Sequence, residues 1–152
     1  MTGADKEIYI KIAENTGVFR PVEIYCLREI LDDCERRPET DYFLFDERED
    51  GKICGFVILG TTPLTDFSWD IYWLVVDSSW HRKGVGKKLL AKAEAFVLGK
   101  NKRAVFRIET SSKKEYAAAH GFYERTGFAK VGAIPHFYTE NDSLLIFSKH
   151  LI

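Results

Sequence analysis

Two glycines, Gly84 and Gly86, lie between an apolar segment that ends at Val76 and a segment with helical character. Neither glycine has a Cβ atom, so backbone N–H groups there can approach an anion without a side chain in the way. The following helix would direct its positive dipole end and its unpaired N–H groups at the same place. Four cations surround the glycines, although the net charge of the chain is only −1: Arg82, Lys83, Lys87 and Lys88. The segment therefore predicts a site for a phosphate-bearing ligand.

Two common phosphate-binding motifs do not fit these glycines. A P-loop requires Ser or Thr after Gly86-Lys87, where this chain has Lys88, and a further glycine five residues before Gly86. A dinucleotide fingerprint requires a third glycine at the position of Leu89. The phosphate ligand must therefore be bound in another way.

The segment His81–Gly86 (HRKGVG) resembles the acetyl-CoA loop of the GNAT (N-acetyltransferase) superfamily, Gln/Arg-x-x-Gly-x-Gly/Ala, at both glycines. His81 replaces the Gln or Arg of the family and can still donate a hydrogen bond to a phosphate. The segment Ala119–Phe128 (AHGFYERTGF) is similar to the C-terminal signature of the family, Ala-x-x-Phe/Leu-Tyr-Glu-x-x-Gly-Phe. Both motifs occur in the order and at the spacing typical of the family.

The resemblance implies transfer of an acetyl group from acetyl-CoA to a primary amine by direct attack in a ternary complex. We expect a small-molecule amine as the acceptor. Protein lysines or N-termini are an alternative acceptor class, and a non-catalytic acyl-CoA-binding module is an alternative function. Backbone groups near the end of the preceding strand would bind the pantetheine arm, and Tyr116 stands where the family often has an Asn that contacts it. The expected cosubstrate-binding residues are Val75, Val76, His81, Arg82, Lys83, Gly84, Val85, Gly86, Lys87 and Tyr116.

Three residues are candidates for the chemistry. The resemblance directs the hydroxyl of Tyr123 at the thioester sulfur. A phenol with a pKa near ~10 is a weaker acid than a thiol near ~8.5, so Tyr123 is expected to stabilise the departing thiolate by a hydrogen bond, with helix dipoles and cations lowering its pKa. Asp70 is the first candidate for the base that takes the proton of the amine, and Glu109 is the second. In the alternative interpretation, Tyr123 is a core aromatic residue and both carboxylates are solvated charges.

The composition is that of a soluble globular protein, with 45% hydrophobic and 30% charged residues. We expect one N-acetyltransferase domain over residues 1–152. The near-neutral charge argues against a nucleic-acid partner, and the absence of a long apolar stretch argues against a membrane. Three cysteines without paired spacing indicate reduced thiols in the cytoplasm, and four scattered histidines indicate no metal site. A homodimer is an open alternative.

The expected elements alternate between strands and helices. An alternating run of isoleucines predicts a first strand at Glu7–Ala13, and Pro21 would open a helix. Ser68–Val76, the helix after the glycines and Arg103–Thr110 form a predicted β-α-β unit, with Asp70, Tyr72, Leu74 and Val76 on one face of the strand. The order fits the GNAT-like α+β class: a mixed, mostly antiparallel sheet of about seven strands, flanking helices and one central parallel pair that separates to admit the cosubstrate.

Overall fold

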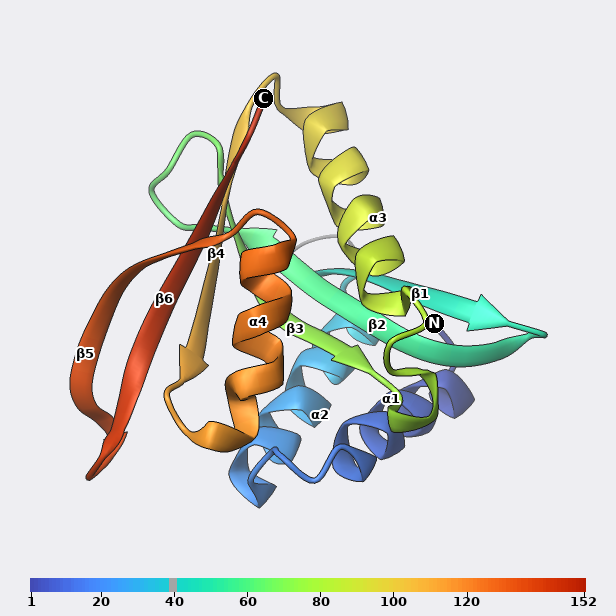
Figure 1. Cartoon of the computed structure of the whole chain (residues 1–152). Helices are drawn as coiled ribbons and strands as arrows, with labels where there is room; N and C mark the ends of the chain where they lie inside the picture. The colour runs from blue at the N-terminus through green and yellow to red at the C-terminus, as the bar shows by residue number, and fades with distance from the viewer. Residues whose placement is uncertain (39–40) are drawn as a thin grey trace.

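The computed structural model describes residues 1–38 and 41–152, and Figure 1 labels its elements. The helices are α1 (Gly3–Asn15), α2 (Pro21–Arg36), α3 (Val85–Lys100) and α4 (Ala117–Arg125), with 3-10 turns η1 (Ser78–Trp80) and η2 (Lys114–Tyr116). The strands are β1 (Phe43–Glu49), β2 (Lys52–Thr61), β3 (Ser68–Val76), β4 (Ala104–Ser111), β5 (Ala129–Thr139) and β6 (Asp142–Leu151).

These strands form one sheet in the order β1-β2-β3-β4-β6-β5. β3 and β4 are parallel, and all other neighbours in this sheet are antiparallel. Helix α3 connects the parallel pair, so the predicted β-α-β unit is confirmed. The predicted α+β class is confirmed too, but the sheet of the described residues has six strands in place of about seven.

The strand predicted at Glu7–Ala13 is wrong, because these residues lie in helix α1. Thr2 and Asp5 form a capping box that satisfies backbone N–H groups at the start of this helix. Ile8, which the alternation placed with the other isoleucines on one face, is 42% exposed. The buried residues instead recur at the spacing of a helix: Tyr9, Ile10, Ile12 and Ala13. This difference accounts for the smaller number of strands.

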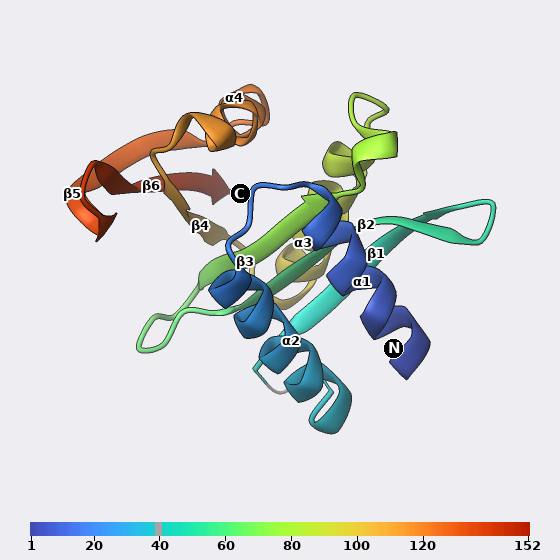
Figure 2. The same cartoon turned by 90° about the horizontal axis from the view of Figure 1, so that it is seen from below.

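Helices cover both faces of the sheet. α1 and α2 lie on one face, over β1, β2 and β3, as Figure 2 shows. The core of this layer includes Leu27, Leu31, Phe56, Ile58 and Val75. α3 and α4 lie on the opposite face, where their core includes Val85, Leu89, Val97, Phe106 and Tyr123. No helix within residues 1–38 or 41–152 is long and apolar enough to cross a membrane.

β3 and β4 separate after a short paired stretch. Their register ends at the pair Asp70 and Arg107, although both strands continue. On the other side of β3, the register with β2 skips Tyr72, so β3 carries one extra residue there. This β-bulge changes the alternation of side chains. Leu74 and Val76 therefore pack on the α3 side, opposite the carboxylate of Asp70, and the predicted common face for these residues is wrong.

An ion pair joins helix α3 to strand β1. Lys92 Nζ lies 2.6 Å from Glu47 Oε2 and holds the pKa of Glu47 below its ordinary value. We expect Lys92→Gln to lower the free energy of unfolding at pH 7 by about 0.5–1 kcal/mol. Because the carboxylate form of Glu47 is favoured in the folded state, this difference is present above the pKa of the unfolded chain and disappears as the pH falls through both pKa values. Urea unfolding of both proteins at pH 7 and pH 3 measures it.

Candidate active site

Two hydrogen bonds fix the segment between the end of β3 and the start of the glycine loop, residues 81–87. The Asp77 N–H donates to the Cys54 carbonyl at 2.8 Å, and Nε2 of His81 lies 2.9 Å from the Val76 oxygen. Gly84 is the N-cap of α3 and has a φ of +80°, which L side chains rarely adopt. A Cβ atom at Gly84 would meet no heavy atom within 4 Å. The start of α3 therefore offers backbone N–H groups to an open space.

The four predicted cations do not all serve this space. Lys88 lies 2.9 Å from Glu49 and 3.6 Å from Glu47, so it belongs to the contact with β1. Lys83 lies 4.8 Å from the centre of the Trp80 ring. Arg82 and Lys87 are exposed and form no ion pair with any residue of the described segments. Three of the four positive charges thus remain available to an anion.

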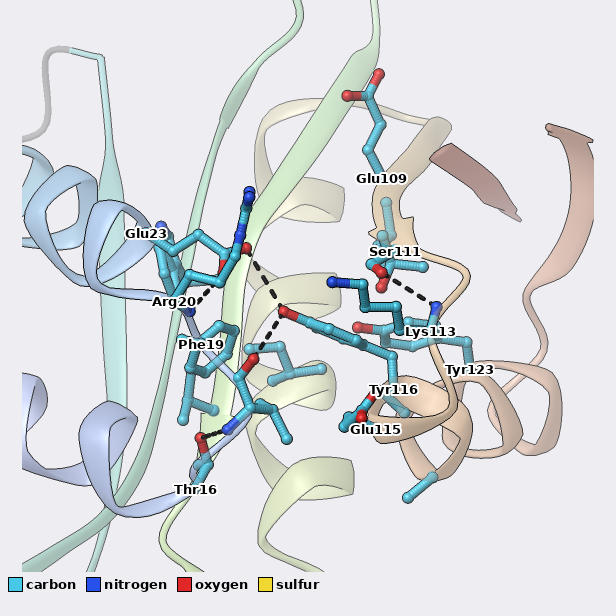
Figure 3. Close-up of a pocket in the computed structure, with 18 of the residues that line it drawn as sticks. Thr16, Phe19, Arg20, Glu23, Glu109, Ser111, Lys113, Glu115, Tyr116 and Tyr123 are labelled. Carbon is cyan, nitrogen blue, oxygen red and sulfur yellow. Dashed lines mark hydrogen bonds and ion pairs between the residues drawn. The ribbon is translucent and has the colours of Figure 1, made fainter. Parts of the chain in front are cut away.

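A cavity of about 520 Å³ opens where β3 and β4 separate. The α1–α2 loop forms one wall, and the end of β4 with the start of α4 forms the opposite wall, as Figure 3 shows. β3 contributes residues 71–76, and the β5–β6 hairpin contributes Tyr138. Of the residues predicted from the sequence, the cavity brings together Tyr123, Glu109, Tyr116, Val75, Val76 and His81.

Tyr123 belongs both to the core and to the cavity wall. Its ring packs against Phe128 and Phe147, and only 9% of the residue is exposed. No hydrogen bond joins its hydroxyl to another described residue, and the side chain points into the cavity (Figure 3). Burial raises the pKa of Tyr123 to about 12, so the predicted lowering by dipoles and cations is wrong. The hydroxyl is therefore protonated at neutral pH and can donate a hydrogen bond.

The two candidate bases differ in position. The carboxylate of Asp70 accepts hydrogen bonds from Arg107 at 2.6 and 3.0 Å and from Thr62 at 3.0 Å, and the residue is 6% exposed. Asp70 is not part of the cavity wall. Glu109 lines the cavity, its side chain is 44% exposed, and its nearest cation is Arg107 at 3.7 Å. Glu109 thus lies where β3 and β4 have separated and lines the cavity, whereas Asp70 lies where the two strands are still paired.

Tyr116 links the two walls of the cavity. Its hydroxyl donates to the Val18 carbonyl at 3.2 Å and lies 3.5 Å from Glu23, which Figure 3 shows as dashed lines across the cavity. Burial raises the pKa of this hydroxyl above its ordinary value. Phe19 packs between Tyr116 and Trp73, with ring centres 6.3 and 4.9 Å away. Tyr116 therefore fixes the α1–α2 loop against α4.

A buried polar group at the far end of β4 was not predicted from the sequence. Ser111 donates to Asp142 at 2.5 Å, and Lys113 Nζ lies 3.8 Å from the same carboxylate. Asp142 is 3% exposed and lines the cavity. It follows directly on the tip of the β5–β6 hairpin, which is the one sequence signal that could have placed it near β4. The group anchors this hairpin to the cavity wall.

Among the aromatic residues of β3 and of the β5–β6 hairpin, Tyr72, Trp73 and Tyr138 line the cavity. Trp69 lies in the core and donates to Asn101 at 3.1 Å. His136 accepts a hydrogen bond from the Asn141 N–H at 3.0 Å within the β5–β6 hairpin.

Residues 39–130 match the sequence model of the acetyltransferase (GNAT) domain. A GNAT-family protein from Desulfovibrio desulfuricans is 29% identical, with a TM-score of 0.89 over 97% of this chain and 92% of that one. The ribosomal-protein-S18-alanine N-acetyltransferase of Escherichia coli shares the fold, with 18% identity and a TM-score of 0.77 over 99% of this chain and 90% of that one. An aminoglycoside 6′-N-acetyltransferase crystallised with coenzyme A also shares it, with 16% identity and a TM-score of 0.76 over 99% of this chain and 93% of that one. A search of curated proteins found no significant match. The chain belongs to the GNAT family of acetyltransferases.

Proposed function

We propose that this protein transfers the acetyl group of acetyl-CoA to a primary amine by direct attack. The observation that carries the proposal is that one cavity is lined both by His81, the first residue of the glycine loop, and by Tyr123, whose hydroxyl is protonated. An anion-binding loop, a reaction cavity and a hydrogen-bond donor for a leaving group are the parts that acyl transfer from a thioester needs.

The residues of the glycine loop fit the phosphates of acetyl-CoA. Gly84, the N-cap of α3, has open space around it, and the exposed side chains of Arg82, Lys83 and Lys87 supply positive charge. His81 is bound to the Val76 carbonyl and so shapes the loop. Beyond Asp70, the edge of β3 that faces β4 has no strand partner in the described sheet, which leaves backbone groups free for the amides of the pantetheine arm.

In the proposed reaction the neutral amine nitrogen attacks the thioester carbonyl, a C–N bond forms and the C–S bond breaks. Glu109 accepts the proton that the amine loses, directly or through one water molecule. Tyr123 donates a hydrogen bond to the sulfur as negative charge develops there. The carboxylate of Asp70, the first candidate base from the sequence, is bound by Arg107 and Thr62 and does not line the cavity, so we assign the proton transfer to Glu109.

Release of free thiol from acetyl-CoA, followed with a thiol-reactive chromophore, tests this function. The panel of acceptors contains ethanolamine, spermidine, kanamycin, free lysine and a short peptide with a free N-terminal alanine. Amine-dependent release supports the enzyme. Binding of CoA by calorimetry without release for any acceptor would favour the non-catalytic acyl-CoA-binding module.

A small-molecule amine remains our expected acceptor. Four carboxylates line the cavity, Glu23, Glu109, Glu115 and Asp142, against two fixed cations, Arg20 and Lys113, and this negative balance suits a cationic amine. Solved structures with the same fold include acetyltransferases named for aminoglycosides and for a ribosomal-protein alanine, so protein N-termini stay the alternative. Faster thiol release with the peptide than with every small amine in the panel would favour that alternative.

Two neighbouring lysines provide a matched test of the glycine loop. We expect Lys87→Gln to weaken CoA binding about 3- to 10-fold, because Lys87 is a cation at the loop without an ion pair to the described residues. Lys88→Gln should change the affinity by less than about 2-fold, since Lys88 already pairs with Glu49 and Glu47. Calorimetric titration with CoA at low salt measures both, and equal losses would contradict this division.

A further inference from the structure

A chain of polar contacts leads from the interior of the sheet to the cavity. Asp70 Oδ1 accepts from Arg107 Nε at 2.6 Å, and Asp70 Oδ2 accepts from Arg107 Nη2 at 3.0 Å and from Thr62 at 3.0 Å. The third guanidinium nitrogen, Nη1, lies 3.7 Å from Glu109 Oε1. Of these four residues, Glu109 is the member that lines the cavity. Arg107 therefore contacts the buried carboxylate and the cavity carboxylate at the same time.

The place of this ion pair in the sheet is specific. Asp70 and Arg107 are the last residues of β3 and β4 that remain in register, and the bulge at Tyr72 follows at once. Beyond this point, backbone pairing no longer joins β4 to β3. Asp70 and Arg107 thus form the final side-chain link between the two strands before Glu109 projects beside the cavity. The position of Glu109 depends on where this link holds β4.

We propose that Arg107 is a positioning residue that holds Glu109 beside the cavity, with Asp70 as its anchor. The inference rests on the proposed function, because it concerns the base assigned there. A guanidinium suits this task because its planar fork carries five N–H donors and can serve two carboxylates together. A lysine ammonium is a compact point charge and cannot reproduce both contacts.

The first test is Arg107→Lys, with Arg103→Lys as the matched control. Arg103 precedes β4 and packs over the Phe67 ring at 4.7 Å, outside the cavity. We expect Arg107→Lys to keep its thermal midpoint near that of the wild type, because a cation still faces Asp70, and to lose at least about 10-fold in kcat. The dissociation constant for CoA should change by less than about 2-fold. Arg103→Lys should match the wild type in kcat and in CoA affinity.

The second test is a double-mutant cycle with Glu109→Gln, using the fastest acceptor of the panel. If Arg107 acts through Glu109, the double variant Arg107→Lys/Glu109→Gln loses no more kcat than Glu109→Gln alone. Additive losses, or a wild-type kcat in Arg107→Lys, would overturn the inference. An equal loss of CoA affinity would also overturn it, because Arg107 would then act on the cosubstrate.

A third variant tests the same inference if Arg107→Lys does not fold. Asp70→Asn/Arg107→Gln removes both charges together, so no unpaired charge is left buried. We expect this variant to fold and to show the same loss of kcat, whereas a wild-type kcat would contradict the inference. Thiol release by the wild-type chain is measured separately. Its absence would refute the proposed function, while normal release with an additive cycle would refute the role of Arg107 alone.

Discussion

Tyr123→Phe should lose about 100-fold or more in kcat, the scale of a lost hydrogen-bond donor to a developing charge, while the affinity for CoA stays the same. The ring of Tyr123 fills the core between α4 and the sheet, and phenylalanine retains it. The hydroxyl has no hydrogen-bond partner among the described residues, so its removal leaves no buried group unsatisfied. Thermal unfolding, CoA titration and initial rates with the fastest acceptor measure the three quantities.

The raised pKa of Tyr123 decides which role this hydroxyl can have. With a pKa of about 12 against about 8.5 for a thiol, complete proton transfer to the sulfur would be uphill by about 5 kcal/mol. In the proposed reaction, the hydroxyl would therefore stabilise the thiolate as a hydrogen-bond donor and keep its proton. Because Tyr123 stays protonated well above neutral pH, its ionisation should cause no loss of activity between pH 7 and pH 10.

Tyr9→Phe is the matched control for this substitution. Tyr9 is a buried tyrosine in the other core, and it donates to Asp46 at 2.8 Å. Its replacement should cost stability through the lost hydrogen bond and leave kcat unchanged. A kcat for Tyr123→Phe close to that of Tyr9→Phe would remove Tyr123 from the proposed chemistry.

The predictions from the sequence are most accurate for short segments that carry a local pattern. The glycines at 84 and 86 and the segment Ala119–Phe128 carry local patterns. The glycines lie at the start of α3, outside the residues that line the cavity, whereas Ala119 and Tyr123 belong to the cavity wall. The β-α-β unit follows from apolar runs and a helix between them. The prediction of a first strand was wrong because Ile8, Ile10 and Ile12 alternate as they would in a strand. In the structure these residues form a helix, which packs Tyr9 against Phe56.

The rest of the site depends on contacts between residues distant in the sequence. Tyr116 and Val18 are 98 residues apart, and Ser111 and Asp142 are 31 residues apart. The position of Asp70 depends on a single extra residue, Tyr72, which no periodicity shows. A one-residue bulge reverses the face of every later side chain, so strict alternation placed Asp70 with the wrong neighbours.

The two glycines of the loop differ in how cleanly they can be tested. A Cβ atom at Gly86 would lie 3.1 Å from the ring of Phe122, the residue next to Tyr123. A substitution at Gly86 would therefore disturb α4 and the Tyr123 hydroxyl together with the loop. A Cβ atom at Gly84 would meet open space, so a substitution there changes the loop alone.

Gly84→Val should weaken CoA binding by at least about 10-fold, or about 1.4 kcal/mol, because the new side chain occupies the space in front of the N–H groups of α3. It should also cost about 1–2 kcal/mol of stability, since the φ of +80° is unfavourable for valine. Gly51→Val separates the two effects, because Gly51 has a φ of +77° with equally open surroundings and lies in the turn between β1 and β2. This control should share the lower thermal midpoint and retain wild-type CoA affinity. Equal CoA affinities in both variants, measured by calorimetry, would show that the phosphates bind elsewhere.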